Sequence, residues 1–254
     1  MKGPFGMTGQ TALVTGSTAG MGLEIARGLA HVGARTVISS HDDADLEAAR
    51  ARLGSEGVDV GGIVCDISDA ASARSLAERA FQRFGRIDSL IVHAGGFTPY
   101  GPLAEAGRQD VERAFSTTVF NNLELIQNFL PRLAGAGGGS VVVTSSIASV
   151  RASPILGVYG AAKAALNSLV RNIAAEWGDR GVRANLIAPA TVRTRFSEVL
   201  WSDPLREEAA GHKTALGRIA EPAEVVGAVL LFASPAGSYI TGQTLLIDGG
   251  RSVL

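Results

Sequence analysis

The sequence predicts an α/β fold, a doubly wound parallel sheet of about seven strands with helices on both faces. Short apolar runs rich in β-branched residues alternate with segments of helical periodicity along almost the whole chain. The runs are apolar throughout rather than at every second position, as expected for strands covered by helices on both faces. Strands that alternate with helices form right-handed βαβ units, and such units build a parallel sheet.

The expected elements follow one another in regular order. The seven expected strands cover residues 11–16, 34–40, 60–66, 87–95, 139–146, 183–189 and 243–250. The six expected helices cover residues 20–33, 43–54, 71–85, 110–133, 159–178 and 221–234. Gly33, Gly54, Gly85 and Gly181 stand where helices should end, because glycine readily adopts the left-handed conformation of a helix C-terminus.

The length and continuity of the chain predict a single domain over residues 1–254. An α/β domain of 254 residues is common, and no repeat, charge block or low-complexity linker divides the sequence. Residues 194–222 are longer than an ordinary connection between a strand and a helix. Long insertions at strand ends often bind substrates, so we expect this segment to form a substrate loop.

Composition excludes several function classes. The formal net charge is −1, so neither a nucleic acid nor an anionic membrane is expected as a partner. The single cysteine, Cys65, cannot form an intrachain disulfide and is expected to be a buried apolar side chain, which suits the cytoplasm. The first ten residues lack the apolar core of a signal peptide, and "VVGAVLLFA" is too short to cross a bilayer. We expect a cytoplasmic protein with no metal site.

A glycine-rich turn follows the first expected strand. "TGSTAGMG" places Gly16, Gly20 and Gly22 immediately before a helix, with Ser17 and Met21 between them. Glycines allow the backbone to turn tightly and to approach a pyrophosphate, which the helix N-terminus then binds through its free N–H groups. The spacing differs from the commoner dinucleotide fingerprint and could also be a plain tight turn, but its place between a strand and a helix favours a dinucleotide site.

The end of the second strand bears on the choice between NAD and NADP. An acidic residue there usually binds the adenosine ribose of NAD, and this chain has Ser40 and His41 instead. The missing carboxylate removes repulsion against a 2′-phosphate, which slightly favours NADP. Asp42 could serve the ribose of NAD if the turn is shifted, Ala19 adds no basic group to the glycine turn, and Ser40 and His41 could be ordinary loop residues.

Tyr159, Lys163 and Ser146 form a coherent catalytic hypothesis. Tyr159 and Lys163 are four residues apart on an apolar helix and therefore share a face, while Ser146 ends the preceding strand. Reduction of a carbonyl needs a hydride on carbon and a proton on oxygen. Tyrosine can donate that proton, although its usual pKa of about 10 is high, and a nearby lysine cation should lower the pKa. Ser146 can hydrogen-bond the substrate oxygen.

Several motifs together resemble one family. They are "TGSTAGMG", "CDIS", "HAG", the serine pair thirteen residues before Tyr159, "YGAAK", "RANLIAPATVRT" and "ITGQTLLIDGG". In these motifs, spread over nearly the whole chain, the sequence resembles the single-domain short-chain dehydrogenases/reductases. The resemblance implies a Rossmann-type fold, an NAD- or NADP-dependent interconversion of a carbonyl and a secondary alcohol, a small-molecule substrate and a homotetramer.

The resemblance also implies individual roles. Tyr159 would be the acid/base, Lys163 would also hold the nicotinamide ribose, and Ser146 would orient the substrate. The cofactor contacts implied elsewhere are Asp66 and Ile67 at the adenine, His93, Ala94 and Gly95 at the adenosine ribose and beside it, and Val192 and Thr194 at the nicotinamide carboxamide.

Two positions depart from the family pattern. Val92 and His93 replace a pair of asparagines after the fourth strand, and His93 is expected to be a tolerated replacement rather than a catalyst. Thr118 stands where the family has an asparagine thought to hold a water that links the lysine to solvent. We expect an altered proton relay, in which Thr118 holds the water differently or Asn121 and Asn122 compensate.

Other interpretations stay open on sequence alone. Tyr159 could pack as a core aromatic while Lys163 reaches the surface. The chain could be a dinucleotide-binding sensor or assembly protein without catalysis, or an epimerase or dehydratase acting on nucleotide sugars. Phe196 and Trp201 could cap a ring-bearing substrate or could pack the loop onto the body, so the substrate's identity, stereochemistry and direction of reaction are undetermined.

Overall fold

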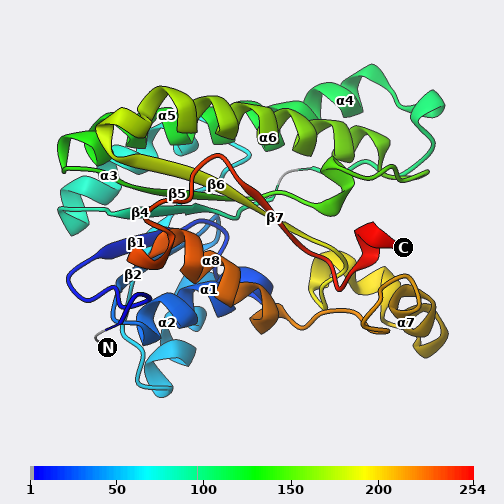
Figure 1. Ribbon diagram of the computed structural model, residues 1–254, viewed down its shortest axis with the longest axis horizontal. Coiled ribbons are helices and arrows are strands. Elements are labelled where there is room, and N and C mark those ends of the chain that lie inside the picture. Colours follow the sequence, from blue (N-terminus) through cyan, green and yellow to red (C-terminus); the bar gives the residue numbers. More distant parts are fainter. Residues whose placement is uncertain (1–2, 96) are drawn as a thin grey trace.

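The computed structural model describes residues 3–95 and 97–254 and confirms the predicted α/β class (Figure 1). Seven parallel strands form one sheet in the order β3-β2-β1-β4-β5-β6-β7. Their bounds are β1 Thr11–Val14, β2 Arg35–Ser40, β3 Val60–Val64, β4 Ser89–Val92, β5 Gly139–Thr144, β6 Val182–Pro189 and β7 Thr244–Ile247. The order reverses between β1 and β4, which is where doubly wound sheets bind ligands beyond the carboxyl ends of their strands.

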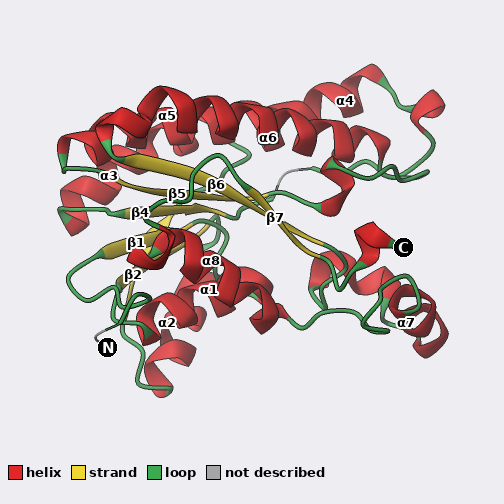
Figure 2. Cartoon of the chain, viewed as in Figure 1, coloured by secondary structure: helices red, strands yellow, loops and turns green. Residues whose placement is uncertain are grey.

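Helices cover both faces of this sheet (Figure 2). One face carries α3 (Ala70–Phe84), α5 (Asn121–Gly135) and α6 (Gly157–Trp177), and the other carries α1 (Gly20–His31), α2 (Asp43–Ser55) and α8 (Val226–Ala233). Each face has its own hydrophobic core, with Phe129 and Leu125 fully buried on the first and Ile25 and Leu29 on the second. The strands are therefore buried from both sides, which explains their unbroken apolar sequence.

Capping residues set most helix ends where the sequence predicts them. The carboxylates of Asp42 and Asp69 accept backbone N–H bonds at the starts of α2 and α3. Gly33 and Gly85 adopt positive φ after α1 and α3, as predicted. The prediction for Gly54 is wrong, because it lies inside α2 and the left-handed residue is Gly57.

The helix predicted over residues 110–133 is not continuous. It consists of α4 (Arg108–Phe115), a π-helical turn (Ser116–Phe120) and α5. Side chains stabilise the wider turn: the Thr117 hydroxyl donates to the Arg113 carbonyl at 2.9 Å, and the Asn122 amide donates to the Thr118 carbonyl at 2.9 Å. Such turns occur often at functional sites, and this one contains Thr118.

The segment after β6 folds into short helices. A 3₁₀ helix (Arg195–Leu200) leads to α7 (Pro204–Gly211), and a second 3₁₀ turn (Pro222–Val225) precedes α8. The Arg193 guanidinium forms ion pairs with both Glu207 and Glu221, which ties the ends of this segment together. Within the described parts of the chain, no helix is long and apolar enough to cross a membrane, and no cluster of three potential metal ligands occurs.

Candidate active site

The glycine turn after β1 is shaped by close backbone contacts. Gly16 and Gly20 adopt positive φ, which glycine tolerates best. A Cβ on Gly22 would lie 2.2 Å from the Gly16 carbonyl oxygen, and one on Gly16 would lie 2.8 Å from the Ala94 Cα. Larger residues would therefore fill or distort the turn, and its path leaves the N-terminus of α1 open to a ligand.

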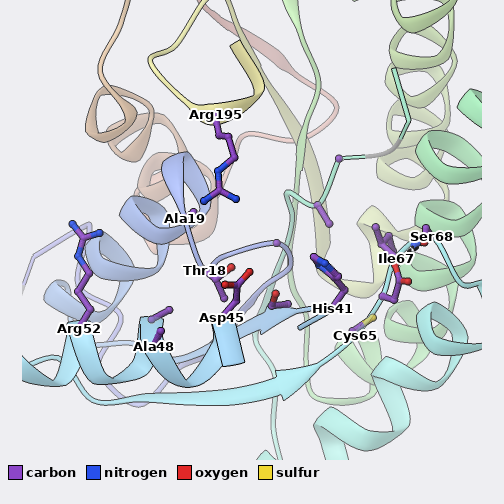
Figure 3. A pocket seen from close by; sticks show the side chains of 16 residues that line it. Thr18, Ala19, His41, Asp45, Ala48, Arg52, Cys65, Ile67, Ser68 and Arg195 are labelled. Atoms are coloured by element: carbon purple, nitrogen blue, oxygen red, sulfur yellow. Dashed lines mark hydrogen bonds between the residues drawn. The ribbon is translucent and has the colours of Figure 1, made fainter. Parts of the chain in front are cut away.

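A pocket of about 490 Å³ lies beside this turn (Figure 3). It extends from the turn across the ends of β2 and β3 to the loop after β4. Of the predicted cofactor residues, it is lined by Gly16, Ser40, His41, Asp66, Ile67, Ala94 and Gly95. The turn, the open helix terminus and the pocket together have the shape and polar groups that a dinucleotide needs.

Other predicted cofactor residues lie outside this pocket. Ser17 is fully buried, donates to the Val14 carbonyl at 2.7 Å and accepts from the Ser39 N–H at 2.9 Å. Its role in the structure is to hold the turn against β2. Val192 is also buried, and its carbonyl accepts from the Ser197 hydroxyl. The remaining residues outside the pocket are Gly20, Met21, Gly22, His93, Tyr159, Lys163 and Thr194.

The end of the pocket formed by the loop after β3 has a fixed backbone. The Asn121 side-chain amide donates to the Ile67 carbonyl at 2.7 Å, so helix α5 holds this loop in place. Asp66 Oδ1 accepts bonds from both the Ser68 N–H and the Ser68 hydroxyl, and these bonds lower the pKa of Asp66. Asn121 therefore acts at this loop, and its side chain makes no hydrogen bond to Thr118 or Lys163 among the described residues.

Two arginines of the pocket were missed by sequence reasoning. Arg52 projects from α2 at the outer end of the pocket, and Arg195 extends toward Ala19 and Thr18 from the segment after β6 (Figure 3). Asp42, the alternative ribose ligand, instead caps α2 by accepting from the Asp45 N–H at 2.8 Å. The helical periodicity of α2 could have shown that Arg52 lies on a face turned away from the core. Nothing in the sequence indicates where the side chain of Arg195 points.

Lys163 is buried beneath the site and points to the end of β5. It is 5% exposed, and its Nζ donates to the Thr144 carbonyl oxygen at 2.8 Å. Burial lowers the pKa of Lys163 to about 8, so the side chain is still mainly cationic at neutral pH. The cation is thus held by a backbone acceptor, 5.8 Å from the centroid of the Tyr159 ring.

Tyr159 and Ser146 are brought together as predicted, but the electrostatics differ. The Ser146 hydroxyl lies close enough to the Tyr159 phenol to act to lower the pKa of Tyr159. Burial has the larger effect and raises the pKa of Tyr159 above its usual value. The expectation that Lys163 lowers the pKa of Tyr159 is wrong. The Lys163 ammonium is directed to the Thr144 carbonyl, and burial has the largest effect on the pKa of Tyr159. Tyr159 is therefore a protonated phenol at neutral pH, ready to donate.

Asn167 positions the strand end that carries Ser146. Its Oδ1 accepts from the Ser145 hydroxyl at 2.6 Å, and its Nδ2 donates to the Ser149 hydroxyl at 2.8 Å. A Cβ on Gly160 would lie 2.5 Å from the Ala148 carbonyl oxygen, so this glycine lets the same loop approach α6. Asn167 lies one helical turn after Lys163, a spacing that could have marked it as a member of the site.

His93 lies between the glycine turn and Lys163. Its Nδ1 is 3.0 Å from the Thr144 hydroxyl, and its backbone N–H donates to the Thr15 hydroxyl at 3.0 Å. Burial, with a contribution from the Lys163 charge, lowers the pKa of His93 to about 4. The ring is therefore neutral in the folded protein at neutral pH and bonds to the threonine whose carbonyl accepts from Lys163.

We expect His93 to make the protein acid-sensitive. Between pH 6.5 and 4 the unfolded chain protonates this histidine while the folded chain does not, so stability falls as pH falls through that window. The effect should be on the order of 1–3 kcal/mol. Urea titrations at pH 7 and pH 4.5 should show a smaller acid loss in His93→Asn, and an equal loss in both proteins would contradict the assignment.

Thr118 is 1% exposed within the π-helical turn. Its carbonyl accepts from Asn122, and no hydrogen bond connects Lys163 with Thr118, Asn121 or Asn122 among the described residues. The Asn122 Oδ1 atom is buried without a partner in the protein. The altered proton relay therefore stays a prediction. Of the two neighbouring asparagines, Asn122 is the one with an unpaired buried acceptor atom, whereas Asn121 bonds to the loop after β3.

Phe196 and Trp201, the two aromatic residues of the 194–222 segment, have different surroundings. The Trp201 indole N–H donates to the Thr194 carbonyl at 3.1 Å, and the Arg193 guanidinium lies 5.3 Å from the Trp201 ring centroid. Trp201 therefore stabilises the loop. Phe196 faces the reactive group instead, with its ring centroid 6.1 Å from that of Tyr159.

Comparisons with known proteins agree with this geometry. A family model described as enoyl-(acyl carrier protein) reductase matches residues 16–252. Dehydrogenase/reductase SDR family member 4 of Bos taurus is 38% identical over 95% of this chain and 86% of its own length. The chain belongs to the short-chain dehydrogenase/reductase (SDR) family. It is therefore an NAD(P)-dependent oxidoreductase.

Solved SDR structures resemble the whole chain. A gluconate 5-dehydrogenase from Burkholderia cenocepacia, in complex with NADP and tartrate, has a TM-score of 0.93 and 29% identity and covers 99% of this chain and 98% of its own. A 7α-hydroxysteroid dehydrogenase, complexed with NADH and 7-oxo glycochenodeoxycholic acid, has a TM-score of 0.91 and 30% identity. It covers 97% of this chain and 96% of its own. Both of these SDR neighbours therefore bind a nicotinamide dinucleotide, and the substrates in their names differ widely.

Proposed function

We propose that this SDR protein interconverts a carbonyl and a secondary alcohol by hydride transfer, with Tyr159 as the acid/base. The observation that carries the proposal is the grouping of three side chains: the Lys163 ammonium is buried 5.8 Å from the centroid of the Tyr159 ring, and the Ser146 hydroxyl lies near the phenol. This group lies next to a glycine cradle that a Cβ would fill. A neutral tyrosine beside a serine hydroxyl can bind and protonate a carbonyl oxygen, which a plain core aromatic could not do.

In this mechanism each residue has one task. The Ser146 hydroxyl binds the substrate oxygen and holds it near the phenol. The Tyr159 O–H donates its proton to that oxygen during reduction and, as a phenolate, accepts it during oxidation. Lys163 holds a positive charge at the end of β5 and would bind the nicotinamide ribose, while Asn167 fixes the loop of Ser146. The bound cofactor supplies or accepts the hydride.

The proposed cofactor contacts follow the order of the dinucleotide. Asp66 and Ile67 would bind the adenine, Ala94 and Gly95 the adenosine ribose, and Val192 and Thr194 the nicotinamide carboxamide. A Cβ on Gly20 would lie 3.2 Å from Thr194 Cγ2, so the turn and the segment after β6 lie against each other, and a bound dinucleotide would meet both. Ser17, Met21 and Gly22 shape the turn, and Ser40 and His41 bound the ribose end.

We expect NADP(H) to bind more tightly than NAD(H). His41, Arg52 and Arg195 line the pocket, and a 2′-phosphate forms charge-assisted bonds with such groups. Arg52→Ala should weaken NADPH binding by roughly three- to tenfold and leave NADH binding nearly unchanged. Calorimetric titration with both cofactors measures this, with Arg108→Ala, a remote exposed arginine, as the matched control. An equal loss for both cofactors would remove Arg52 from the 2′-phosphate site.

A coupled absorbance screen tests the proposed reaction. NADH and NADPH would be offered with a varied set of ketones and aldehydes, and NAD⁺ and NADP⁺ with the matching alcohols. We expect turnover that depends on Tyr159. A protein that binds the cofactor with micromolar or better affinity and turns over no member of the set would contradict the proposal and support a sensor role.

The assembly, the domain organisation and the location are part of the proposal. Strand β7 is at an edge of the sheet and exposes Leu245, and Tyr239 and Val253 are exposed nearby in the sequence. These apolar groups support a homotetramer, which light scattering would measure.

We further propose one domain over residues 1–254, with the substrate loop at 194–222. We also propose a cytoplasmic location, which the single cysteine supports.

A further inference from the structure

One exposed aromatic ring lies beside the phenol of Tyr159, and a second exposed aromatic residue stands on the segment after β4. Phe196 is 58% exposed, with its ring centroid 6.1 Å from that of Tyr159 and tilted by 37°. Tyr100 is 56% exposed, and the backbone bridge between Gly101 and Leu156 places its segment along the start of α6. Exposed aromatic rings beside a reactive group are costly unless a ligand covers them.

Both aromatic residues stand on fixed backbone. Next to Tyr100, the Gly101 N–H donates to the Ile155 carbonyl at 3.0 Å, so the 100–103 segment lies along the start of α6. Phe196 belongs to the 3₁₀ helix that the Ser197 hydroxyl and the Trp201 indole pin from within. The backbone that carries both rings is therefore held in place before a substrate binds, which lowers the entropic cost of binding.

Other apolar side chains are exposed on the same three segments, after β4, before α6 and after β6: Leu103, Val150, Ile155, Val199 and Leu200. The side chain of Leu103 packs against the start of α6 at Gly157. The segments next to the start of α6 therefore expose several apolar side chains besides Phe196.

The arginines of these segments are engaged elsewhere. Arg193 pairs with Glu207 and Glu221, Arg151 donates to the Arg251 carbonyl, and Arg206 donates to the Val199 carbonyl. Arg195 extends into the dinucleotide pocket instead (Figure 3). Arg193 is thus neutralised by two carboxylates, and Arg195 serves the dinucleotide pocket rather than the surface beside the Tyr159 ring.

We propose that the site takes a ketone, or the corresponding secondary alcohol, whose reacting carbon bears an apolar ring that packs against Phe196 beside Tyr159. The ring is aromatic or alicyclic. This inference rests on the proposed function and names its substrate class. It separates this chain from sugar-acid dehydrogenases, whose substrates carry hydroxyls and a carboxylate instead of an apolar ring.

The test compares ketones that differ in one property. Acetophenone carries the ring, butanone lacks it, and 5-ketogluconate carries charge and hydroxyls. We expect wild-type kcat/KM to be highest for acetophenone. Phe196→Ala should raise KM for acetophenone about tenfold or more and leave the value for butanone within about twofold, since stacking of rings contributes beyond simple burial.

A binding measurement makes the test independent of turnover. Saturation-transfer NMR of acetophenone with the cofactor-loaded protein should show ring contacts that Phe196→Ala removes and that Phe5→Ala, a remote exposed phenylalanine, retains. Preference for 5-ketogluconate, or equal binding by Phe196→Ala and Phe5→Ala, would overturn the inference. Turnover that survives Tyr159→Phe would instead overturn the proposed function, while the NMR comparison would still decide the ring site.

Discussion

Tyr159→Phe is expected to lower kcat by about 10²–10⁴-fold, because the variant keeps the ring and loses the proton that the substrate oxygen must receive. Burial keeps Tyr159 protonated at neutral pH, so the loss should be largest in the direction of carbonyl reduction. The phenylalanine ring fills the same space beside Phe196, so cofactor affinity and thermal stability should change little. Single-turnover kinetics with the reduced cofactor, together with calorimetric cofactor binding, measure both quantities.

Tyr239→Phe provides the matched control for this experiment. Tyr239 lies outside the pocket, and phenylalanine keeps the apolar ring that the proposed subunit contacts would use, so its variant should retain wild-type turnover. Full activity in Tyr159→Phe would show that another group supplies the proton. A loss in Tyr159→Phe accompanied by weaker cofactor binding would mean that the phenol positions the cofactor instead.

Lys163→Met is expected to make the protein more stable and much less active. Burial lowers the pKa of Lys163 from 10.5 to about 8, which corresponds to about 3 kcal/mol of cost for holding the charge in the fold. Methionine removes this cost but leaves the Thr144 carbonyl without its hydrogen bond, a loss of about 1 kcal/mol. We therefore expect a net gain of about 2 kcal/mol at pH 7 and a loss of turnover of tenfold or more.

The pH dependence identifies the cause of this gain. Between pH 8 and 10.5 the unfolded wild type binds more protons at this lysine than the folded protein does, so wild-type stability rises with pH. The advantage of Lys163→Met should therefore be complete below pH 8 and should shrink as pH rises through that window. Urea unfolding at pH 7 and pH 9.5 measures the difference, and a variant less stable than wild type at pH 7 would contradict the assignment.

The sequence predicts the fold well because its signals are local. Apolar strands, capping aspartates and the glycine turn each act within a few residues, and the family motifs extend the prediction to the seven-stranded sheet. The π-helical turn was missed because it depends on the side chains of Thr117 and Asn122 bonding to the backbone within an otherwise helical sequence.

The site is predicted less completely because it depends on burial and distant contacts. The sequence brings Ser146, Tyr159 and Lys163 together by spacing, and their geometry agrees. The sign of the shift in the pKa of Tyr159 could not be predicted, since the path of the ammonium to Thr144 is set by β5 and α6 together. Arg195 was missed for the same reason, because the direction of its side chain follows from the whole substrate loop.

The neighbouring positions of Arg195 and Phe196 have a kinetic consequence. One side chain extends into the dinucleotide pocket and the next faces the reacting phenol, yet both belong to a single short 3₁₀ helix. A cofactor phosphate that engages Arg195 would add to the bonds that already hold the helix on which the substrate's ring packs. We therefore expect compulsory-order kinetics, with the dinucleotide arriving first and departing last, and a slower off-rate for the dinucleotide once a ring ketone is in place.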